Sequence, residues 1–196
     1  MTLGAPIISP ERLQLRKLAM FAYWEDEDAL EAFLSKTRLG QKLNAGWHVR
    51  LQFLRQWGQF AGFDNLPEGV SDTDTNKPIV AVTLARLKLP EVFRFIRWGR
   101  PVEELVRDDP NTTLAMAAIR PLQTFSNFSI WRSQEAMTNM VRGRSNCPRA
   151  SRHADAMVER ARRDFHHQFM TFRFRAVSEH GSWQGNSHFI PDVVNG

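Results

Sequence analysis

The chain has 196 residues, of which 42% are hydrophobic and 24% charged, proportions that are typical of a globular protein and exclude a disordered or membrane-spanning one. The net charge of +5 comes mainly from arginines between Arg142 and Arg175, but no nucleic-acid-binding motif accompanies them, so we expect no nucleic-acid partner. The apolar runs are too short for a transmembrane segment and the first residues do not form a secretory signal, so we expect a cytoplasmic protein. Cys147 is the single cysteine, which excludes an intrachain disulfide.

The first part of the chain predicts a strand, a helix and a second strand. Residues 13–24 end in an aromatic, strand-like run, and the acidic residues that follow suit the positive N-terminus of a helix over residues 26–42. Residues 48–56 alternate apolar and polar side chains, as a half-buried strand does. Residues 62–78 are rich in Gly, Pro, Asp, Asn and Thr and predict a connector.

The remaining residues predict the order strand, helix, strand, strand, helix, strand. We expect a strand at 79–88, a helix from Pro90 to Arg107, strands at 112–119 and 124–131, a helix from Ser133, a loop at 143–151, a helix at 152–168 and a strand at 170–177. This order is that of a ferredoxin-like unit, in which both helices pack on one face of an antiparallel sheet. The first part shows only the closing strand, helix and strand of such a unit, so we expect its opening strand and helix to be absent.

A weak internal repeat also indicates two related halves. Residues 21–33 recur at a constant offset as residues 128–140, and the pattern Gly58-x-Phe60-x-Gly62 returns as Gly181-x-Trp183-x-Gly185. We therefore predict an α+β protein with a truncated N-terminal ferredoxin-like half, a linker and a complete C-terminal half. The predicted boundaries are 1–62, 63–78 and 79–196.

Six segments carry a resemblance to a known family. They are PIVAVTLARLKLPEVFRFIRW, TFSNFSIWRSQEAM and RHADAMVERARRDFHHQFMTFRF in the second half, and AYWEDEDALEAFL, GWHVRL and WGQFAG in the first. These segments resemble spheroidene monooxygenase and its relatives in the dimeric α/β-barrel group. The resemblance implies two ferredoxin-like halves whose sheets close into a barrel, bound haem, and oxygen-dependent conversion of a terminal methylene of an acyclic carotenoid to a ketone with electrons from ferredoxin. The chain departs from the family pattern in its incomplete first half and in a longer, more polar loop at residues 143–151.

Three histidines are candidate ligands of a haem iron, which needs an axial donor that is usually a neutral imidazole. In the helix expected at residues 152–168, His153 lies on the face predicted to meet the sheet. It shares that face with Met157, Ala161 and Phe165. His153 also matches a histidine in the last helix of the resembling family. His166, predicted on the solvent side, and His167, predicted between the two, are second choices, and a hydrogen-bonded core histidine is the alternative to a ligand.

Two arginines and several aromatic residues complete the candidate site. Arg173 and Arg175 alternate with Phe172 and Phe174 along the last predicted strand, so both guanidinium groups share one face. Paired arginines suit the propionates of haem, and a solvent-exposed charged edge is the alternative. An apolar pocket for a long polyene would be lined by Trp98, Phe128, Trp131 and Trp183, which otherwise belong to the core.

The sequence therefore predicts a haem-dependent monooxygenase that acts on an acyclic carotenoid or a similar apolar polyene and receives electrons from reduced ferredoxin. The alternatives are a cofactor-free oxygenase or isomerase of the same barrel class, and a non-catalytic barrel that binds an apolar ligand or an acidic partner. Motifs of zinc hydrolases, nucleotide enzymes and serine esterases are absent from the sequence. Because the missing unit would leave a sheet edge open, we also expect a homodimer.

Overall fold

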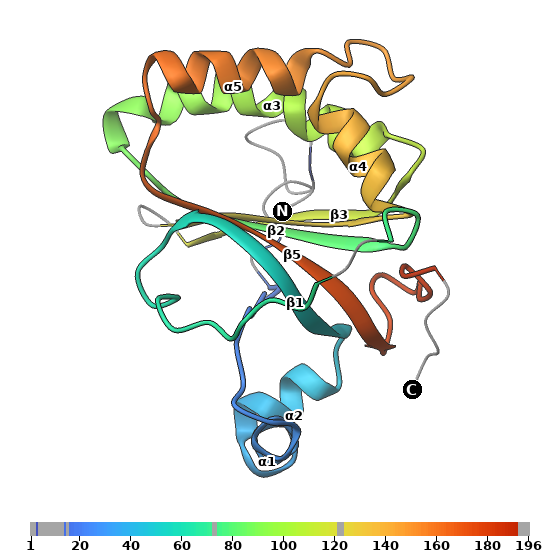
Figure 1. Ribbon diagram of the computed structural model, residues 1–196. Coiled ribbons are helices and arrows are strands. Elements are labelled where there is room, and N and C mark those ends of the chain that lie inside the picture. Colours follow the sequence, from blue (N-terminus) through green and yellow to red (C-terminus); the bar gives the residue numbers. More distant parts are fainter. Residues whose placement is uncertain (1–2, 4–13, 15, 72–73, 121–123, 192–196) are drawn as a thin grey trace.

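The computed structural model describes residues 3, 14, 16–71, 74–120 and 124–191, which form one antiparallel sheet in the order β1-β5-β2-β4-β3 (Figure 1). The strands are β1 (His48–Gln59), β2 (Ile79–Leu87), β3 (Thr112–Arg120), β4 (Thr124–Trp131) and β5 (His166–His180). The helices are α1 (Glu27–Lys36), α2 (Arg38–Asn44), the 3-10 turn η1 (Leu89–Glu91), α3 (Val92–Asp108), α4 (Gln134–Val141) and α5 (Arg152–Arg162). The predicted α+β class is confirmed.

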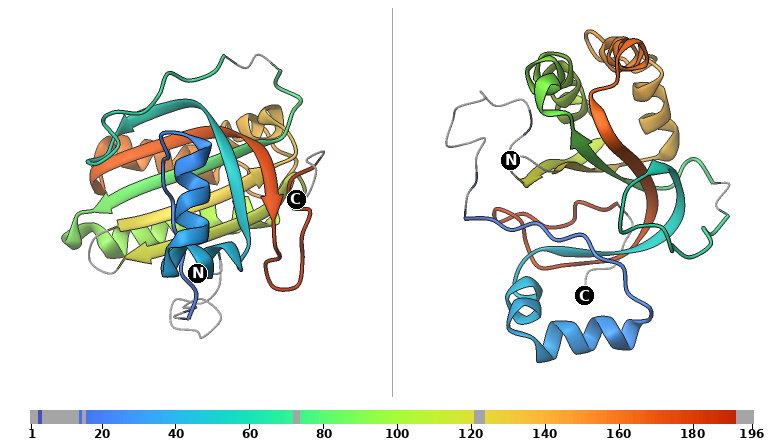
Figure 2. Two further views of the ribbon diagram at one scale, coloured as in Figure 1. Left: turned by 90° about the horizontal axis from the view of Figure 1, so that it is seen from below. Right: turned by 90° about the vertical axis from the view of Figure 1, so that its left-hand side faces the viewer.

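The helices lie on both sides of the sheet. Helices α3, α4 and α5 cover one face, and α1 with α2 lies below the opposite face. Figure 2 shows the same two layers from below and from the side. We call the face under α3, α4 and α5 the helix-facing side of the sheet.

Strand β5 separates an apolar side from a polar one. Phe172 and Phe174 are buried in the apolar cluster on the side away from α3, α4 and α5, where both rings contact Phe21. Arg173 is paired with Ala81 of β2, which packs against side chains of α4. Arg173 therefore lies on the helix-facing side, opposite to Phe172 and Phe174, as the alternation along the strand predicts.

The predicted elements between residues 79 and 141 are confirmed. Strands β3 and β4 are antiparallel neighbours, and residues 121–123 between them lie outside the described ranges. Helix α4 begins after Ser133, whose hydroxyl accepts a hydrogen bond from the Ala136 N–H, as an N-cap does. Helix α3 continues through Pro101.

Two expectations for the first part of the chain are wrong. The described residues 16–24 form no strand, and the helix expected at residues 26–42 is divided into α1 and α2. The division falls at Thr37, which has an extended backbone and whose hydroxyl accepts a hydrogen bond from the Gly40 N–H, so that it ends α1 and caps α2. The strand expected at residues 48–56 is confirmed as β1.

The last predicted helix is too long and its strand too short. Helix α5 ends at Arg162, and β5 already begins at His166, because residues 166–169 pair with β2 and Phe169 also pairs with β1. The predicted packing face of α5 is also wrong, since Met157 is 40% exposed whereas Ala156 is buried.

The expected barrel closure is not observed. Strand β1 pairs with β5, so the strand of the first half extends the sheet of the second half as an edge strand. Within the described ranges the sheet is open, with β1 and β3 at its two edges. Among the described residues, no helix is long and apolar enough to cross a bilayer.

Candidate functional site

Arg173 occupies an unusual position for a charged side chain. One of its terminal nitrogens, Nη1, donates hydrogen bonds to Thr171 Oγ1 and to the Phe172 carbonyl oxygen, both at 2.9 Å. Its Nε is inaccessible to solvent and has no hydrogen-bond partner within the described part of the chain. Burial, and then the positive charge of Arg55, lower the pKa of Arg173 to about 10. The structure thus holds a partly desolvated cation in the layer between sheet and helices.

Arg175 lies on the same side of β5 but is used differently. Its Nη1 donates to the carbonyl oxygen of Pro78, and Nη2 lies 3.5 Å from the carbonyl oxygen of Asp74. These contacts tie β5 to the connector that precedes β2. Arg175 is therefore positioned by backbone groups at the end of the sheet.

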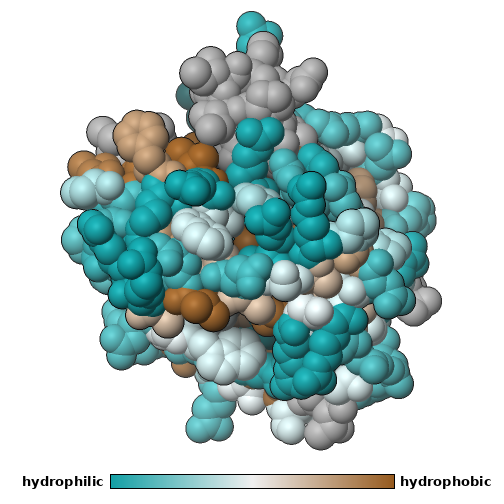
Figure 3. Space-filling view, turned by 90° about the horizontal axis from the view of Figure 1, so that it is seen from above, coloured by the Kyte–Doolittle hydropathy of each residue, from teal (hydrophilic) through white to brown (hydrophobic). Residues whose placement is uncertain are grey.

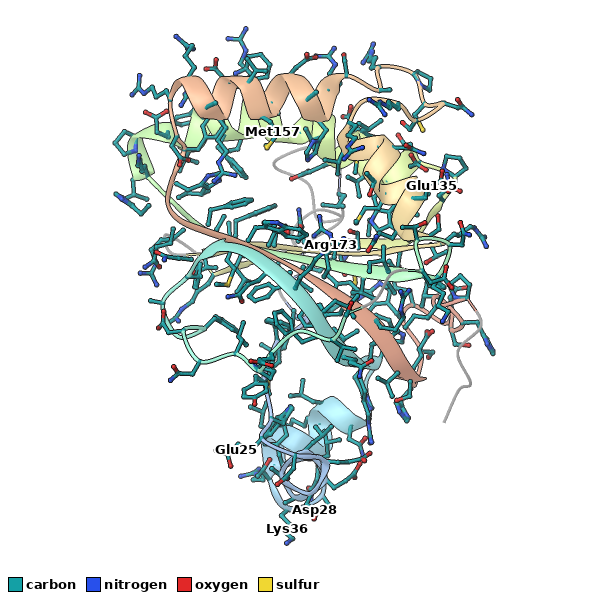
Figure 4. All side chains as sticks on the ribbon, in the orientation of Figure 1. Glu25, Asp28, Lys36, Glu135, Met157 and Arg173 are labelled. Carbon is teal, nitrogen blue, oxygen red and sulfur yellow. The ribbon has the colours of Figure 1, made fainter. Side chains whose placement is uncertain are left out.

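His153, the first candidate ligand, lies at the start of α5. Its Nδ1 is 3.1 Å from the carbonyl oxygen of Val141 at the end of α4, so Nδ1 carries the proton of this hydrogen bond. In the neutral imidazole, Nε2 then carries the lone pair that could bind a metal. Burial lowers the pKa of His153, the hydrogen bond to Val141 raises it, and the charge of Arg173 lowers it further. The charge of Arg173 therefore acts on His153 although the structure shows no hydrogen bond between the two side chains within the described ranges. Figure 4 shows Met157 on α5 above Arg173 on the sheet.

His166 is buried, which corrects its predicted position on the solvent side. A register shift between Arg86 and Leu87 sets His166 opposite Leu87, so its imidazole points to the helix-facing side. There the imidazole contacts the rings of Phe95, Phe165 and Phe169, with centroids 5.2–6.0 Å apart within this group. The neighbouring His167 is exposed.

The two nitrogens of His166 have different surroundings. Nδ1 lies 3.0 Å from Asp164 Oδ1, whereas Nε2 is solvent-inaccessible and has no partner among the described residues. Burial and the charge of Arg160 lower the pKa of His166, so the neutral imidazole is favoured. Burial raises the pKa of Asp164, but the backbone N–H of His166 and the charge of Arg160 hold this pKa below its usual value. A neutral imidazole that donates from Nδ1 to a carboxylate keeps the lone pair of Nε2 for an electrophile or a metal.

A cavity of about 740 Å³ adjoins this histidine. Its lining comes from the end of β1, the end of α5 and the start of β5, and consists of Gly58, Gln59, Phe60, Ala61, Asp64, Arg160, Asp164, His166, His167, Gln168 and Phe169. Gly58 has φ +83°, and a Cβ at this position would lie 2.2 Å from the Phe169 carbonyl oxygen. The glycine therefore lets β1 approach β5 closely at the cavity wall.

The four aromatic residues predicted to line one pocket are not brought together. Trp131 is fully buried beside α4, and its Nε1 donates to Ser129 Oγ. Phe128 lies on the other side of the sheet against Trp47. Trp183 lines a separate cavity of about 160 Å³, and Trp98 is half-buried in α3.

Several of the arginines form a charge network between α3 and α5. Arg94 donates to Glu91 Oε2 at 2.7 Å and to Glu159 Oε1 at 2.5 Å, and Arg162 and Arg163 pair with Glu159 and Glu91. Hydrogen bonds from Arg162 and Arg94 lower the pKa of Glu159 to about 2. Part of the arginine excess thus stabilises the helix layer, and Figure 3 shows that its outer surface is mainly hydrophilic with small apolar patches.

Sequence reasoning missed three residues that the structure adds to these sites. Asp164 follows the end of α5 and holds His166, while Arg55 and Trp57 stand on β1 beside Arg173. The signal for Asp164 was its spacing of two residues from a histidine. Arg55 and Trp57 are two residues apart on β1 and therefore share one face of the strand. Their proximity to Arg173 depends on the pairing of β1 with β5, which the sequence did not reveal.

The fold and these sites define an α+β protein with an open five-stranded sheet and two histidine-containing regions on its helix-facing side. The chain is similar to two curated proteins named spheroidene monooxygenase. It is 27% identical over 173 residues to the one from Rubrivivax gelatinosus, covering 86% of this chain and 64% of the relative. It is 29% identical over 150 residues to the one from Rhodobacter capsulatus, covering 74% of this chain and 59% of the relative. The predicted resemblance to this family is thus confirmed.

The chain spans about six-tenths of the length of these relatives. No protein-family model matches the chain, and no solved structure matches it.

Proposed function

We propose that the chain is a haem-dependent monooxygenase, or the corresponding part of one, that oxidises an acyclic carotenoid or a similar apolar polyene to a ketone. The observation that carries the proposal is the similarity to two spheroidene monooxygenases over most of this chain. The two relatives come from different organisms and have the same name.

The residues at the 740 Å³ cavity fit a haem ligand set. His166 has one nitrogen held by a carboxylate and a second nitrogen that is buried without a partner in the described ranges. A histidine that ligates a metal is usually oriented in this way by a second group. We therefore place the haem at His166, with His153 as the alternative ligand and Arg173 and Arg175 as the groups for propionates in that alternative. Haem iron would supply a centre for the reductive activation of dioxygen.

The chain's own residues would position the ligand and exclude water. Asp164 holds the Nδ1 proton of His166 and fixes the ring orientation. The rings of Phe95, Phe165 and Phe169 surround the imidazole and keep solvent from it.

The partners are proposed on the same basis. Reduced ferredoxin or a similar acidic electron carrier would approach the arginine-rich side of α5, where Arg162 and Arg163 are exposed.

Residues 79–180 would form a ferredoxin-like half, because β5, β2, β4 and β3 are neighbours in that order with α3, α4 and α5 on one side. A homodimer would use one of the edge strands β1 and β3, and the molecular mass in solution tests this arrangement.

Activity is tested with the haem-loaded protein, an acyclic carotenoid in detergent, oxygen and a reducing system. We expect an oxygen- and reductant-dependent product in which a methylene has become a carbonyl, detected by its mass and its red-shifted absorption. Haem-loaded protein that consumes no oxygen and leaves the carotenoid unchanged would contradict the proposal. Free haem at the same concentration is the control.

A further inference from the structure

A group of cationic side chains on the helix-facing side of β1 and β5 has no anionic counterpart. Arg55 and Arg173 are directly paired across the two strands, and like charges in this position repel each other. Neither arginine forms an ion pair with a carboxylate anywhere in the part of the chain that the structure describes.

The contacts of the two guanidinium groups leave donors for a ligand. Arg55 Nη2 donates to Gln134 Oε1 at 2.9 Å. Arg173 uses Nη1 for its contacts with Thr171 and Phe172, while its buried Nε has no partner in the described structure. A buried donor without an acceptor is costly, and the cost falls when an acceptor binds.

An indole ring lies close to both of these cations. The Cζ atoms of Arg55 and Arg173 are 5.1 and 5.4 Å from the centroid of the Trp57 ring. Trp57 is 48% exposed and Arg55 is exposed, so the group can be reached from solvent at the β1 edge. Met157 of α5, which is also exposed, lies above Arg173 (Figure 4).

We propose that Arg55, Arg173 and Trp57 form a binding site for an oxyanion, namely a phosphate or carboxylate group. Guanidinium groups match both oxyanions through paired N–H donors, and the bound charge would relieve the repulsion between the two arginines. The indole face holds the guanidinium planes in place. The oxyanion can be free or part of an organic ligand, of which a haem propionate is one example. The inference does not rest on the proposed oxygenase activity.

Inorganic phosphate is the first probe, titrated calorimetrically into haem-free protein at low ionic strength in Tris chloride. We expect measurable binding that weakens at least about tenfold in Arg173→Gln and by a smaller factor in Arg55→Gln. Arg97→Gln, which removes the same charge from the exposed surface of α3, should bind as the wild type does. Trp57→Phe should retain binding but lose the change in tryptophan fluorescence that phosphate causes.

The second probe distinguishes the source of the oxyanion. Haem and haem dimethyl ester, whose carboxylates are blocked, are titrated into the wild type and Arg173→Gln. Tighter binding of haem than of its ester, with the difference lost in the variant, would identify a propionate as the occupant. Phosphate binding with no such difference would identify a free anion.

The proposal is wrong if the wild type binds neither phosphate nor haem carboxylates, or if Arg55→Gln and Arg173→Gln bind phosphate as tightly as Arg97→Gln. Because Arg55 is exposed, its variant tests the proposal even if Arg173→Gln fails to fold. Loss of phosphate binding with an intact haem spectrum would affect this site alone and leave the proposed oxygenase function standing.

Discussion

The two sides of β5 differ in chemistry although they belong to one strand. On one side, Phe172 and Phe174 stack on each other and pack within an apolar cluster. On the other side, Thr171 and Arg173 carry hydrogen-bonding groups into the layer beneath α5. A buried unsatisfied polar group lowers stability, whereas a buried phenyl ring raises it. The comparison indicates that the buried rings on the apolar side of β5 stabilise the fold, whereas the polar groups on its helix-facing side are the ones from which we build the proposed oxyanion site.

The largest expected effect on stability lies on the apolar side. Phe172→Ala removes a fully buried ring and should lower the free energy of unfolding by about 3–5 kcal/mol. Arg173→Met, one residue further along, replaces a partly desolvated cation by an apolar side chain of similar length and should leave stability unchanged or raise it. Urea denaturation of both variants measures the difference. A larger loss for Arg173→Met than for Phe172→Ala would reverse the assigned roles of the two sides.

A smaller effect is expected where β1 meets the cavity wall. Gly58→Ala should cost about 2–3 kcal/mol, because it combines a positive φ with a Cβ that would meet the Phe169 carbonyl oxygen. Gly62→Ala is the matched control, since its φ is +94° but nothing lies within 4 Å of the added Cβ. The control should cost about 1 kcal/mol from backbone strain alone. Equal midpoints of thermal unfolding for the two variants would show that the close approach of β1 and β5 is unimportant.

The smallest effect concerns acid stability of the helix layer. The pKa of Glu159 is lowered to about 2, so its stabilising contribution is complete above its usual value of 4.5 and is lost as the pH falls toward 2. Glu159→Gln removes this group, so the free energy of unfolding should decline less steeply between those pH values in the variant than in the wild type. Denaturant unfolding at several acidic pH values measures the two slopes. Parallel slopes would mean that solvent screens the network completely.

Elements with a local signal were predictable from the sequence. Strands β2, β3 and β4 follow from β-branched and aromatic runs between turn residues, and the start of α4 follows from the N-cap at Ser133. The repeated glycine pattern also has a local cause. Its four glycines, Gly58, Gly62, Gly181 and Gly185, all have positive φ. The repeat therefore reflects four backbone positions with positive φ, which glycine adopts readily.

What the sequence could not supply depends on pairing between distant strands. The helical periodicity of α5 continues to Phe165, but the backbone of the next residues pairs with β1 and β2, which ends the helix early. The same pairing turns His166 inward and sets Arg55 beside Arg173. His153 is half-buried, but Met157, which was expected on the same face of the helix, is exposed, so helical periodicity did not give the packing face of α5. Register between strands far apart in sequence is set by the complete fold, so candidate sites that cross strands were only partly predicted.

The absorption spectrum of the haem-reconstituted protein tests the assignment of His166 most directly. The wild type should show the Soret band of a histidine-ligated haem, His153→Ala should keep it, and His166→Gly should lose or shift it. Added imidazole should restore the band in His166→Gly, because the small ligand can replace the missing side chain. A band that persists in His166→Gly and disappears in His153→Ala would contradict the account and move the haem to the start of α5.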